Sequence, residues 1–218
     1  MKDREIDIAV RILKREVRRW KEPVVGVVAK ASGDPFLILL STVLSLRTKD
    51  QTTADASERL FRLATSPHAM LAVPRRLIER AIYPVGFYRT KARHIHEICR
   101  DLLKRYGGHV PDDIDELLTL KGVGRKTANL VVTLGFRKLG ICVDIHVHRI
   151  SNRWGYIRTR TPQQSEEALR RKLPRRHWRI FNDLLVPFGQ NLCTPVSPHC
   201  SECKLARCCD RIGVTKSR

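Results

Sequence analysis

Apolar residues recur at helical spacing along almost the whole chain, and no segment alternates apolar and polar residues as a half-buried strand does. At the N-terminus, Ile6, Val10, Leu13, Val17 and Trp20 lie three or four residues apart, which is the spacing of one helix face. The same pattern predicts helices over residues 35–46, 51–64, 75–81, 91–106, 114–120, 125–136, 145–154, 162–173 and 178–188. The sequence therefore predicts an all-α protein.

The length of the chain allows one ordinary domain or two small lobes with a real core, since 218 residues are present and 42% are hydrophobic. Its longest apolar run, residues 36–46, is interrupted by Ser41, Thr42 and Ser45 and is shorter than the roughly 20 residues of a membrane span. The first twenty residues alternate charged and apolar side chains and contain no secretory hydrophobic segment. These features predict an intracellular protein.

The formal net charge is +20, the strongest compositional signal in the chain. Such an excess indicates either a polyanionic partner or a harsh habitat. Nucleic acid is the favoured partner, because phosphate contacts supply most of the non-specific binding energy of basic proteins. The alternative is a solvated basic surface of the kind found on thermophile proteins. Charge alone favours nucleic acid over that alternative.

Seven cysteines are present, and five of them lie within residues 193–209. Cys99 and Cys142 stand in apolar surroundings, which is typical of core thiols. Because no secretion signal is present, the clustered cysteines indicate a metal site rather than a disulfide framework.

The spacing of that cluster is C-x6-C-x2-C-x5-C, formed by Cys193, Cys200, Cys203 and Cys209. Four thiolates in so short a segment suit either Zn²⁺ or a [4Fe–4S] cluster. Spacing alone slightly favours zinc as the commoner metal. Cys208 is interpreted as a spectator, with a one-residue exchange of ligand as the alternative.

Two glycines, Gly122 and Gly124, lie between the predicted helices at 114–120 and 125–136. Glycine allows positive φ angles and close backbone approach, as a tight helix-to-helix turn requires. The amides of such a turn and of the following helix start form an anion site, and on a basic protein the expected anion is a DNA phosphate. A compact connector is the alternative, but the surrounding sequence LKGVGRKTA favours phosphate binding.

Lys126 falls in the first turn of the predicted helix after that turn. Attack on a sugar carbon needs a neutral amine, whereas an exposed lysine is protonated at pH 7. Partial burial and the positive helix end both disfavour the ammonium, so the position suits a nucleophile. A solvated phosphate-binding lysine is the alternative. Asp144 stands just before the predicted helix at 145–154, where an N-cap role is compatible with catalysis.

The segment GVGRKTAN resembles the helix-hairpin-helix of the endonuclease III family of DNA glycosylases, although the family usually has proline where this chain has Lys121. The resemblance implies that Lys126 is the Schiff-base lysine. It also implies that Asp144, in the segment VDIHVHRI, is the catalytic aspartate. The resemblance also implies DNA contacts by residues of the hairpin turn and of the segment VDIHVHRI. These residues are Gly122, Val123, Gly124, Arg125, His146 and Arg149.

The resemblance covers nearly the whole chain and implies two helical lobes. One is a six-helix lobe over residues 29–137, with the helix-hairpin-helix at about 114–136. The other joins residues 1–28 with 138–218 and carries the cysteines, and Lys126 and Asp144 would face each other across a cleft. The matching cysteine spacing now favours a [4Fe–4S] cluster over zinc.

Two further segments resemble the family's loops that insert into DNA. Within residues 42–56, Arg47 replaces a glutamine common in the family, and it is expected to fill the gap left by a flipped base or to contact a phosphate. Within residues 85–92, Tyr88, Arg89 and Lys91 are expected to line the strand, because an aromatic beside cations suits stacking and phosphate binding. A core position for Tyr88 is the alternative.

The function implied is that of a bifunctional DNA glycosylase and abasic-site lyase in base excision repair, acting on oxidised pyrimidines. The damaged nucleotide is flipped out, Lys126 attacks C1′, and β-elimination cuts 3′ to the lesion. The expected partner is double-stranded DNA with damaged bases or abasic sites, and the protein is expected to be a monomer at the nucleoid of a prokaryotic cytoplasm. A mismatch uracil or thymine glycosylase and a non-catalytic iron–sulfur DNA-binding protein are the alternatives.

Overall fold

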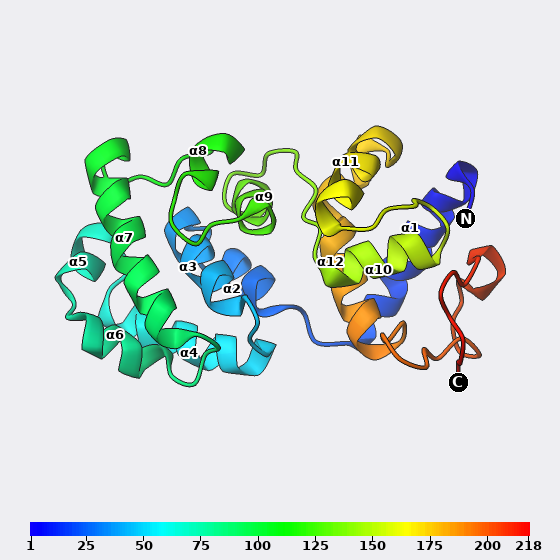
Figure 1. Cartoon of the computed structure of the whole chain (residues 1–218), viewed down its shortest axis with the longest axis horizontal. Helices are drawn as coiled ribbons and strands as arrows, with labels where there is room; N and C mark the ends of the chain where they lie inside the picture. The colour runs from blue at the N-terminus through cyan, green and yellow to red at the C-terminus, as the bar shows by residue number, and fades with distance from the viewer. The chain divides into compact units, whose positions relative to one another are not determined.

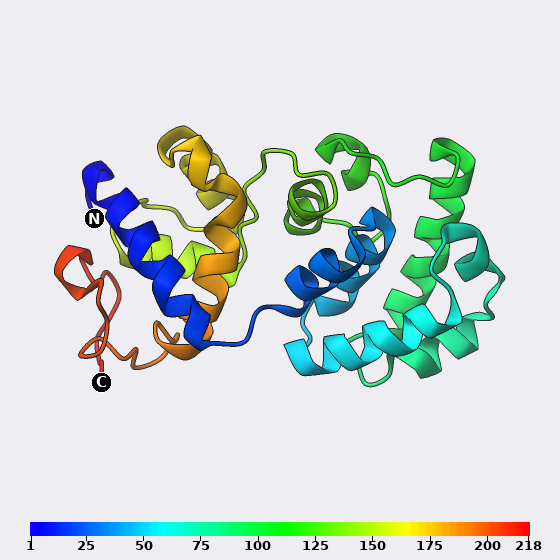
Figure 2. The same ribbon diagram turned by 180° about the vertical axis from the view of Figure 1, so that it is seen from behind.

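The computed structural model describes residues 1–218 and contains helices but no strand (Figures 1 and 2), so the all-α prediction is confirmed. The chain divides into two compact units: Val24–Lys138, and Met1–Pro23 together with Leu139–Arg218. None of the helices is both long and apolar enough to cross a membrane.

The unit Val24–Lys138 is built around one buried helix, α3 (Pro35–Ser45). The side chain of Asp34 accepts a hydrogen bond from the Phe36 amide at 2.7 Å, and Pro35 occupies the first helical position, as the sequence predicts. Helix α3 packs against α2, α4, α7 and α9. The helices around it are α2 (Val24–Ser32), α4 (Asp50–Leu63), α5 (Pro67–Ala72), α6 (Arg75–Ile82), α7 (Tyr88–Tyr106), α8 (Ile114–Leu118) and α9 (Arg125–Leu134).

Two of these helices, α2 and α5, were not expected from the sequence. Four of the nine residues of α2 are valines, whose branched side chains are poor helix formers, so its apolar run gave no clear helical signal. Packing against α3 stabilises it. Helix α5 has only six residues, too few for a clear periodic pattern. Its start is capped by Ser66, whose hydroxyl accepts a hydrogen bond from the Ala69 amide. It packs against α7.

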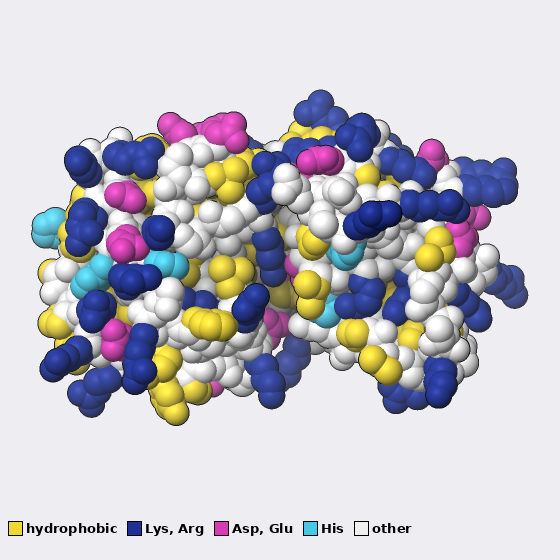
Figure 3. All heavy atoms as spheres, viewed as in Figure 1, with side chains coloured by type: hydrophobic (Ala, Val, Ile, Leu, Met, Phe, Trp, Pro, Cys, Tyr) yellow, Lys and Arg dark blue, Asp and Glu magenta, His cyan; other side chains and the backbone are white.

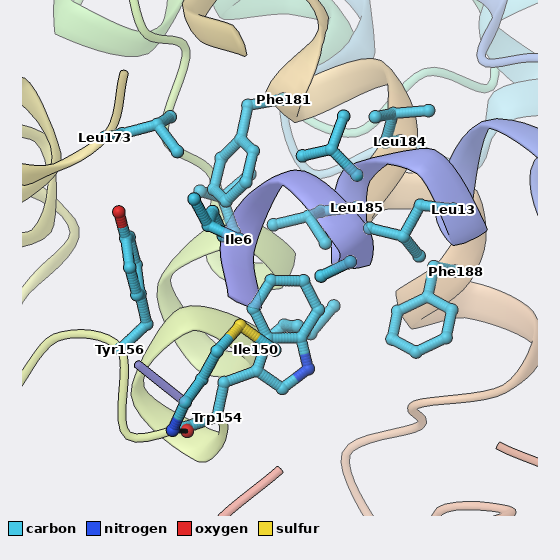
Figure 4. Close-up of a cluster of buried hydrophobic side chains, with 14 of the residues drawn as sticks. Ile6, Leu13, Ile150, Trp154, Tyr156, Leu173, Phe181, Leu184, Leu185 and Phe188 are labelled. Atoms are coloured by element: carbon cyan, nitrogen blue, oxygen red, sulfur yellow. Dashed lines mark hydrogen bonds between the residues drawn. The ribbon is translucent and has the colours of Figure 1, made fainter. Parts of the chain in front are cut away.

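The second unit packs α1 (Ile6–Glu16) and α10 (Ile145–Arg153) on α12 (Trp178–Asn191), with α11 (Pro162–Lys172) beside α10. Four short 3₁₀ helices complete this unit: η1 (Asp3–Glu5), η2 (Val17–Arg19), η3 (Arg175–His177) and η4 (Ala206–Cys208). Its core is mostly aliphatic but contains four buried aromatic residues, of which Trp154 packs edge-on against Phe181 with the ring centroids 6.4 Å apart (Figure 4). Buried aromatic pairs of this kind contribute beyond their buried area. This core supports the N-terminus of α10 and the cysteine-rich tail.

Candidate active site and cysteine pocket

The turn between α8 and α9 has the glycine conformation that its sequence predicts. Gly122 has a φ of +78°, and a Cβ built on it would lie 2.4 Å from Nδ1 of His94, so both backbone conformation and space require glycine. Val123 is buried and its amide donates to the Leu120 carbonyl at 3.1 Å, which anchors the turn.

Gly124 differs from Gly122, because nothing inside the protein requires it to be a glycine. Its φ of −104° is accessible to any residue, and a Cβ at this position would meet no protein atom within 4 Å. Gly124 is the N-cap of α9, and no side chain caps this helix end. The surface therefore presents bare backbone at the positive end of a helix, an arrangement that suits an anion.

Lys126 is the second residue of α9 and is partly exposed. Thr127 and Ala128, which follow it, are buried where α9 packs on α3. This packing fixes the helix that carries the amine. The structure thus places Lys126 in the first helical turn, as the sequence predicts.

Asp144 is the N-cap of α10 and is only 8% exposed. Its Oδ1 accepts hydrogen bonds from the amides of His146 and Val147, both at 2.9 Å. The two bonds fix the orientation of the carboxylate. Asp144 lies in the unit that contains both termini, whereas Lys126 lies in the other.

Arg149 is partly exposed and one of its nitrogens is bonded inside its own unit. Its Nη2 donates to the carbonyl oxygens of Gly189 at 3.0 Å and Cys193 at 2.9 Å, and it lies 3.1 Å from Nδ1 of His146. Burial lowers the pKa of its guanidinium. Through these bonds Nη2 of Arg149 links α10 to α12 and to the start of the cysteine segment. His146 keeps a partly exposed ring.

Lys91 is likewise not available to line a DNA strand. It is 5% exposed, and its Nζ donates to the carbonyl oxygens of Leu44 at 2.8 Å and Leu46 at 2.5 Å and to Oγ1 of Thr48 at 3.3 Å. Sequence alone could not reveal this, since the acceptors lie more than forty residues away in the chain.

The two segments that resemble inserting loops lie side by side in the structure. The Gly86 amide donates to Oγ1 of Thr48 at 3.2 Å, and the Arg47 guanidinium lies 5.6 Å from the centre of the Phe87 ring. Phe87 is 63% exposed and was missed by sequence reasoning. In the sequence Phe87 is an aromatic residue that follows a glycine, and such a residue is easily taken for part of the core.

Tyr88 and Arg89 begin α7 beside these tips. The Arg89 guanidinium lies 5.3 Å from the centre of the Tyr88 ring, and the ring of Tyr83 meets that of Tyr88 edge-on at 5.4 Å. Arg89 and Tyr83 are exposed, and Tyr88 is partly exposed rather than part of the core. The aromatic and cationic side chains that stacking and phosphate binding require are therefore at the surface here.

The four spaced cysteines line one pocket together with Arg153 and His199. Nη1 of Arg153 donates to Sγ of Cys193 at 3.3 Å, and the same side chain donates to the carbonyl oxygens of Thr194 and Pro195. Burial raises the pKa of the Cys203 thiol to about 11. The four cysteines thus line one pocket beside a buried cation, and four thiols have the chemistry of a four-thiolate metal centre, although their side chains are not gathered here into a group that could hold a metal ion.

Cys208 does not line that pocket and instead contacts the Leu205 carbonyl with its Sγ. Cys99 and Cys142 are buried elsewhere, and burial raises the pKa of the Cys99 thiol to about 12. Cys99, Cys142 and Cys208 therefore lie outside the pocket that the four spaced cysteines line.

Lys and Arg side chains are spread over the visible surface of both units, with fewer acidic side chains between them (Figure 3). Several cations close to the termini are paired internally. The clearest are Lys204, bonded to Glu16 at 2.7 Å, and Arg176, bonded to Asp7.

Comparison with known proteins places these features in one family. Residues 40–175 match the family model described as HhH-GPD superfamily base excision DNA repair protein. Endonuclease III of Thermotoga maritima is 45% identical over 204 residues, which cover 94% of this chain and 91% of the relative.

Solved structures give the same result. A trapped covalent intermediate of endonuclease III with DNA, in an estranged-adenine complex, superposes with a TM-score of 0.86 at 34% identity and covers 97% of both chains. A thermostable thymine-DNA glycosylase superposes with a TM-score of 0.81 at 26% identity over 96% of each chain. The chain thus belongs to the endonuclease III family of base excision repair enzymes, which are DNA glycosylases with abasic-site lyase activity.

Proposed function

We propose that this enzyme removes oxidised pyrimidines from double-stranded DNA, with Lys126 as the nucleophile and Asp144 as the catalytic carboxylate. The observation that carries the proposal is the position of Lys126, a partly exposed amine in the first turn of a helix whose N-cap is bare glycine. A covalent complex of a similar endonuclease III with DNA supports a nucleophilic mechanism.

The chemistry follows from an amine attacking a sugar carbon. The neutral Nζ of Lys126 forms a bond to C1′ as the bond to the base breaks, and the departing base takes that electron pair and then a proton. The attacking nitrogen then loses a proton, the C1′–O4′ bond breaks and O4′ takes a proton, which opens the sugar ring. The protonated imine left at C1′ makes the C2′ proton acidic. Loss of this proton expels the 3′ phosphate by β-elimination and cuts the strand.

Asp144 is proposed to stabilise the positive charge on the sugar as the base leaves and to assist deprotonation of Lys126. Two amide hydrogen bonds hold its Oδ1, so the carboxylate is oriented before substrate arrives. Preorganised charge of this kind contributes more to catalysis than a mobile side chain does.

The hairpin is proposed to bind a DNA phosphate through the backbone of Gly122, Val123, Gly124 and Arg125. The open space at Gly124 supports this, because the protein itself does not require a glycine there. Lys121 is exposed next to the turn and adds a cation. His146 is proposed as a second phosphate contact.

We further propose that Cys193, Cys200, Cys203 and Cys209 hold a [4Fe–4S] cluster. When bound, such a cluster supplies four metal–thiolate bonds that fix the tail, and Arg153 donates to one of the ligand sulfurs. The shared pocket of the four cysteines and the membership of the family support this assignment.

Arg47 and Phe87 are proposed to occupy the space that a flipped nucleotide leaves, with Tyr88 and Arg89 along the strand. Exposure of the Phe87 ring next to a guanidinium supports this, since aromatic and apolar wedges unstack base steps. We propose that the enzyme acts as a monomer at the nucleoid of a prokaryotic cytoplasm.

Borohydride trapping tests the nucleophile. Wild-type enzyme should give a covalent adduct on a duplex with an abasic site, and Lys126→Ala should give none. Lys121→Ala is the matched control, because it removes a neighbouring cation; it should weaken binding but still form the adduct. An undiminished adduct in Lys126→Ala would remove Lys126 from this role.

A second experiment tests the lesion class. Duplexes with thymine glycol, dihydrouracil, uracil, oxidised guanine or an abasic site are scored separately for base release and for nicking. The proposal predicts release and nicking on the first two and nicking on the last. Release restricted to mismatched uracil or thymine would favour a mismatch glycosylase, which the similarity to a thymine-DNA glycosylase supports as the second candidate.

A further inference from the structure

Lys91 is a buried cation whose partners are neutral. Its amine donates hydrogen bonds to two backbone carbonyls and one hydroxyl, and no carboxylate is among these partners. Burying a charge without an opposite charge is unfavourable, and burial lowers the pKa of this lysine to about 8. Because burying this charge costs free energy, we expect Lys91 to have a specific structural role.

The acceptors show what that use is. Leu44 and Leu46 flank the end of α3, where the negative end of the helix and its last carbonyls attract a cation. Thr48 follows in the α3–α4 loop, and its hydroxyl also accepts from the Gly86 amide in the α6–α7 loop. Lys91 therefore bonds directly to one loop and, through Thr48, is linked to the other.

Both loops carry a tip residue in an unusual backbone conformation. Arg47 has a φ of +53° and Phe87 a φ of +58°, and residues with side chains avoid this left-handed region unless their surroundings impose it. Arg47 lies between Leu46 and Thr48, both bonded to Lys91, and Phe87 follows Gly86. These bonds thus lie on both sides of Arg47 and directly before Phe87.

The two loops also fit closely against each other. A Cβ on Gly86 would lie 2.6 Å from the Arg47 carbonyl oxygen, so only glycine allows this approach. At the far side of the α6–α7 loop, Arg59 donates to the carbonyl oxygens of Ala81 and Tyr83. The α6–α7 loop is therefore bonded to Arg59 near its start and to Thr48 at Gly86.

We propose that Lys91 is a positioning residue that holds Arg47 and Phe87 as one rigid two-tipped wedge, so that the wedge can separate paired bases around a lesion. The inference rests on the proposed function, since it concerns how that enzyme opens a duplex. If the wedge is already rigid, DNA binding does not include the free-energy cost of ordering its two loops. Its contribution is confined to substrates whose bases must be unstacked and unpaired.

The test compares one lesion in two contexts. Lys91→Met keeps the length of the side chain and removes the charge and donors. On a fully paired duplex, base release should fall by about tenfold or more, as expected when reacting groups are misplaced. On the same lesion inside an unpaired bubble, the rate should stay within about twofold of wild type, because no base pair has to be opened.

A spectroscopic signal separates positioning from a general loss of structure. 2-Aminopurine next to the lesion brightens when it is unstacked, so wild type should raise its fluorescence on binding and Lys91→Met should not. Lys104→Met is the matched control, because Lys104 is an exposed lysine of the same helix, and it should behave as wild type.

Thr48→Val removes the hydroxyl that links Lys91 to Gly86, and Gly86→Ala disturbs the close contact between the two loops. Both variants should lower the ratio of duplex to bubble activity as Lys91→Met does. If Lys91→Met does not fold, these two variants decide the question. An equal loss on duplex and bubble, or no loss on either, would overturn the proposal. Absence of base release by the wild-type enzyme on both substrates would instead count against the proposed function.

Discussion

The two units hold their candidate functional residues in opposite ways. In Val24–Lys138 these residues stand at the surface on short loops and a helix start, as Gly124, Arg47 and Phe87 show. In the unit with the termini, Asp144 and Arg153 are buried and bonded to backbone. Substitutions of Gly124, Arg47 and Phe87 should therefore change DNA binding and catalysis with little effect on folding, whereas those of Asp144 and Arg153 can change stability as well.

Asp144 gives the largest expected effect and separates its two roles. Asp144→Asn keeps an oxygen that accepts from the His146 and Val147 amides but removes the charge. Base release should fall by about 10²–10³-fold with the free energy of unfolding unchanged. Asp144→Ala should lose the same activity and also about 1 kcal/mol of stability, because the helix cap is gone. If Asp144→Asn and Asp144→Ala had equal free energies of unfolding, the hydrogen bonds of Asp144 would not contribute to the stability of its unit.

Arg153 tests whether buried contacts in this unit matter more for stability than exposed cations do in the other. Arg153→Met removes the buried guanidinium that donates to the carbonyl oxygens of Thr194, which is partly exposed, and Pro195, which is exposed. Chemical denaturation should show a loss of about 1–3 kcal/mol. Arg47→Met is the matched control and should change stability by less than about 0.5 kcal/mol, since Arg47 is exposed.

The two glycines of the hairpin sharpen the comparison within the other unit. Gly122→Ala forces a Cβ against His94 and a side chain into positive φ, so it should destabilise the protein by about 1–3 kcal/mol. Gly124→Ala meets no protein atom and should leave the unfolding free energy within about 0.5 kcal/mol of wild type. Its affinity for an abasic duplex should nevertheless fall. Unchanged affinity would remove Gly124 from the phosphate site.

Sequence predicted those parts of the fold and site that depend on neighbours in the chain. Asp34-Pro35 marked the start of α3, and the Gly-Val-Gly turn marked the hairpin and placed Lys126 on α9. Helix α2 was missed because packing against α3 outweighs its weak valine-rich propensity.

The roles of charged residues were harder to predict. Lys91 was expected to line a DNA strand, because its segment resembles an inserting loop of the family. Its amine is instead buried and bonds to carbonyls more than forty residues away, a partnership that no local pattern encodes. Phe87 was overlooked for the converse reason: sequence gives an aromatic residue no sign that folding leaves its ring exposed.

Glu16 offers the smallest effect, and it probes how the cysteine segment is attached to α1. A hydrogen bond from Lys204 holds the pKa of the Glu16 carboxyl below its usual range. A carboxylate with a depressed pKa stabilises the protein above its unfolded pKa near 4.5 and loses this contribution as pH falls through the lower folded value. Because Lys204 is 63% exposed, solvent screens the pair and the contribution should be about 1 kcal/mol or less.

Glu16→Gln should therefore be less stable than wild type near neutral pH, and the difference should vanish in acid. Unfolding in denaturant at a series of pH values between neutral and acidic measures it. Glu58→Gln, on α4 in an exposed pair with Arg62, is the matched control and should be nearly neutral throughout. If Glu58→Gln lost as much stability as Glu16→Gln, the buried end of the Glu16 pair would confer no advantage, and burial would not be what distinguishes the two units.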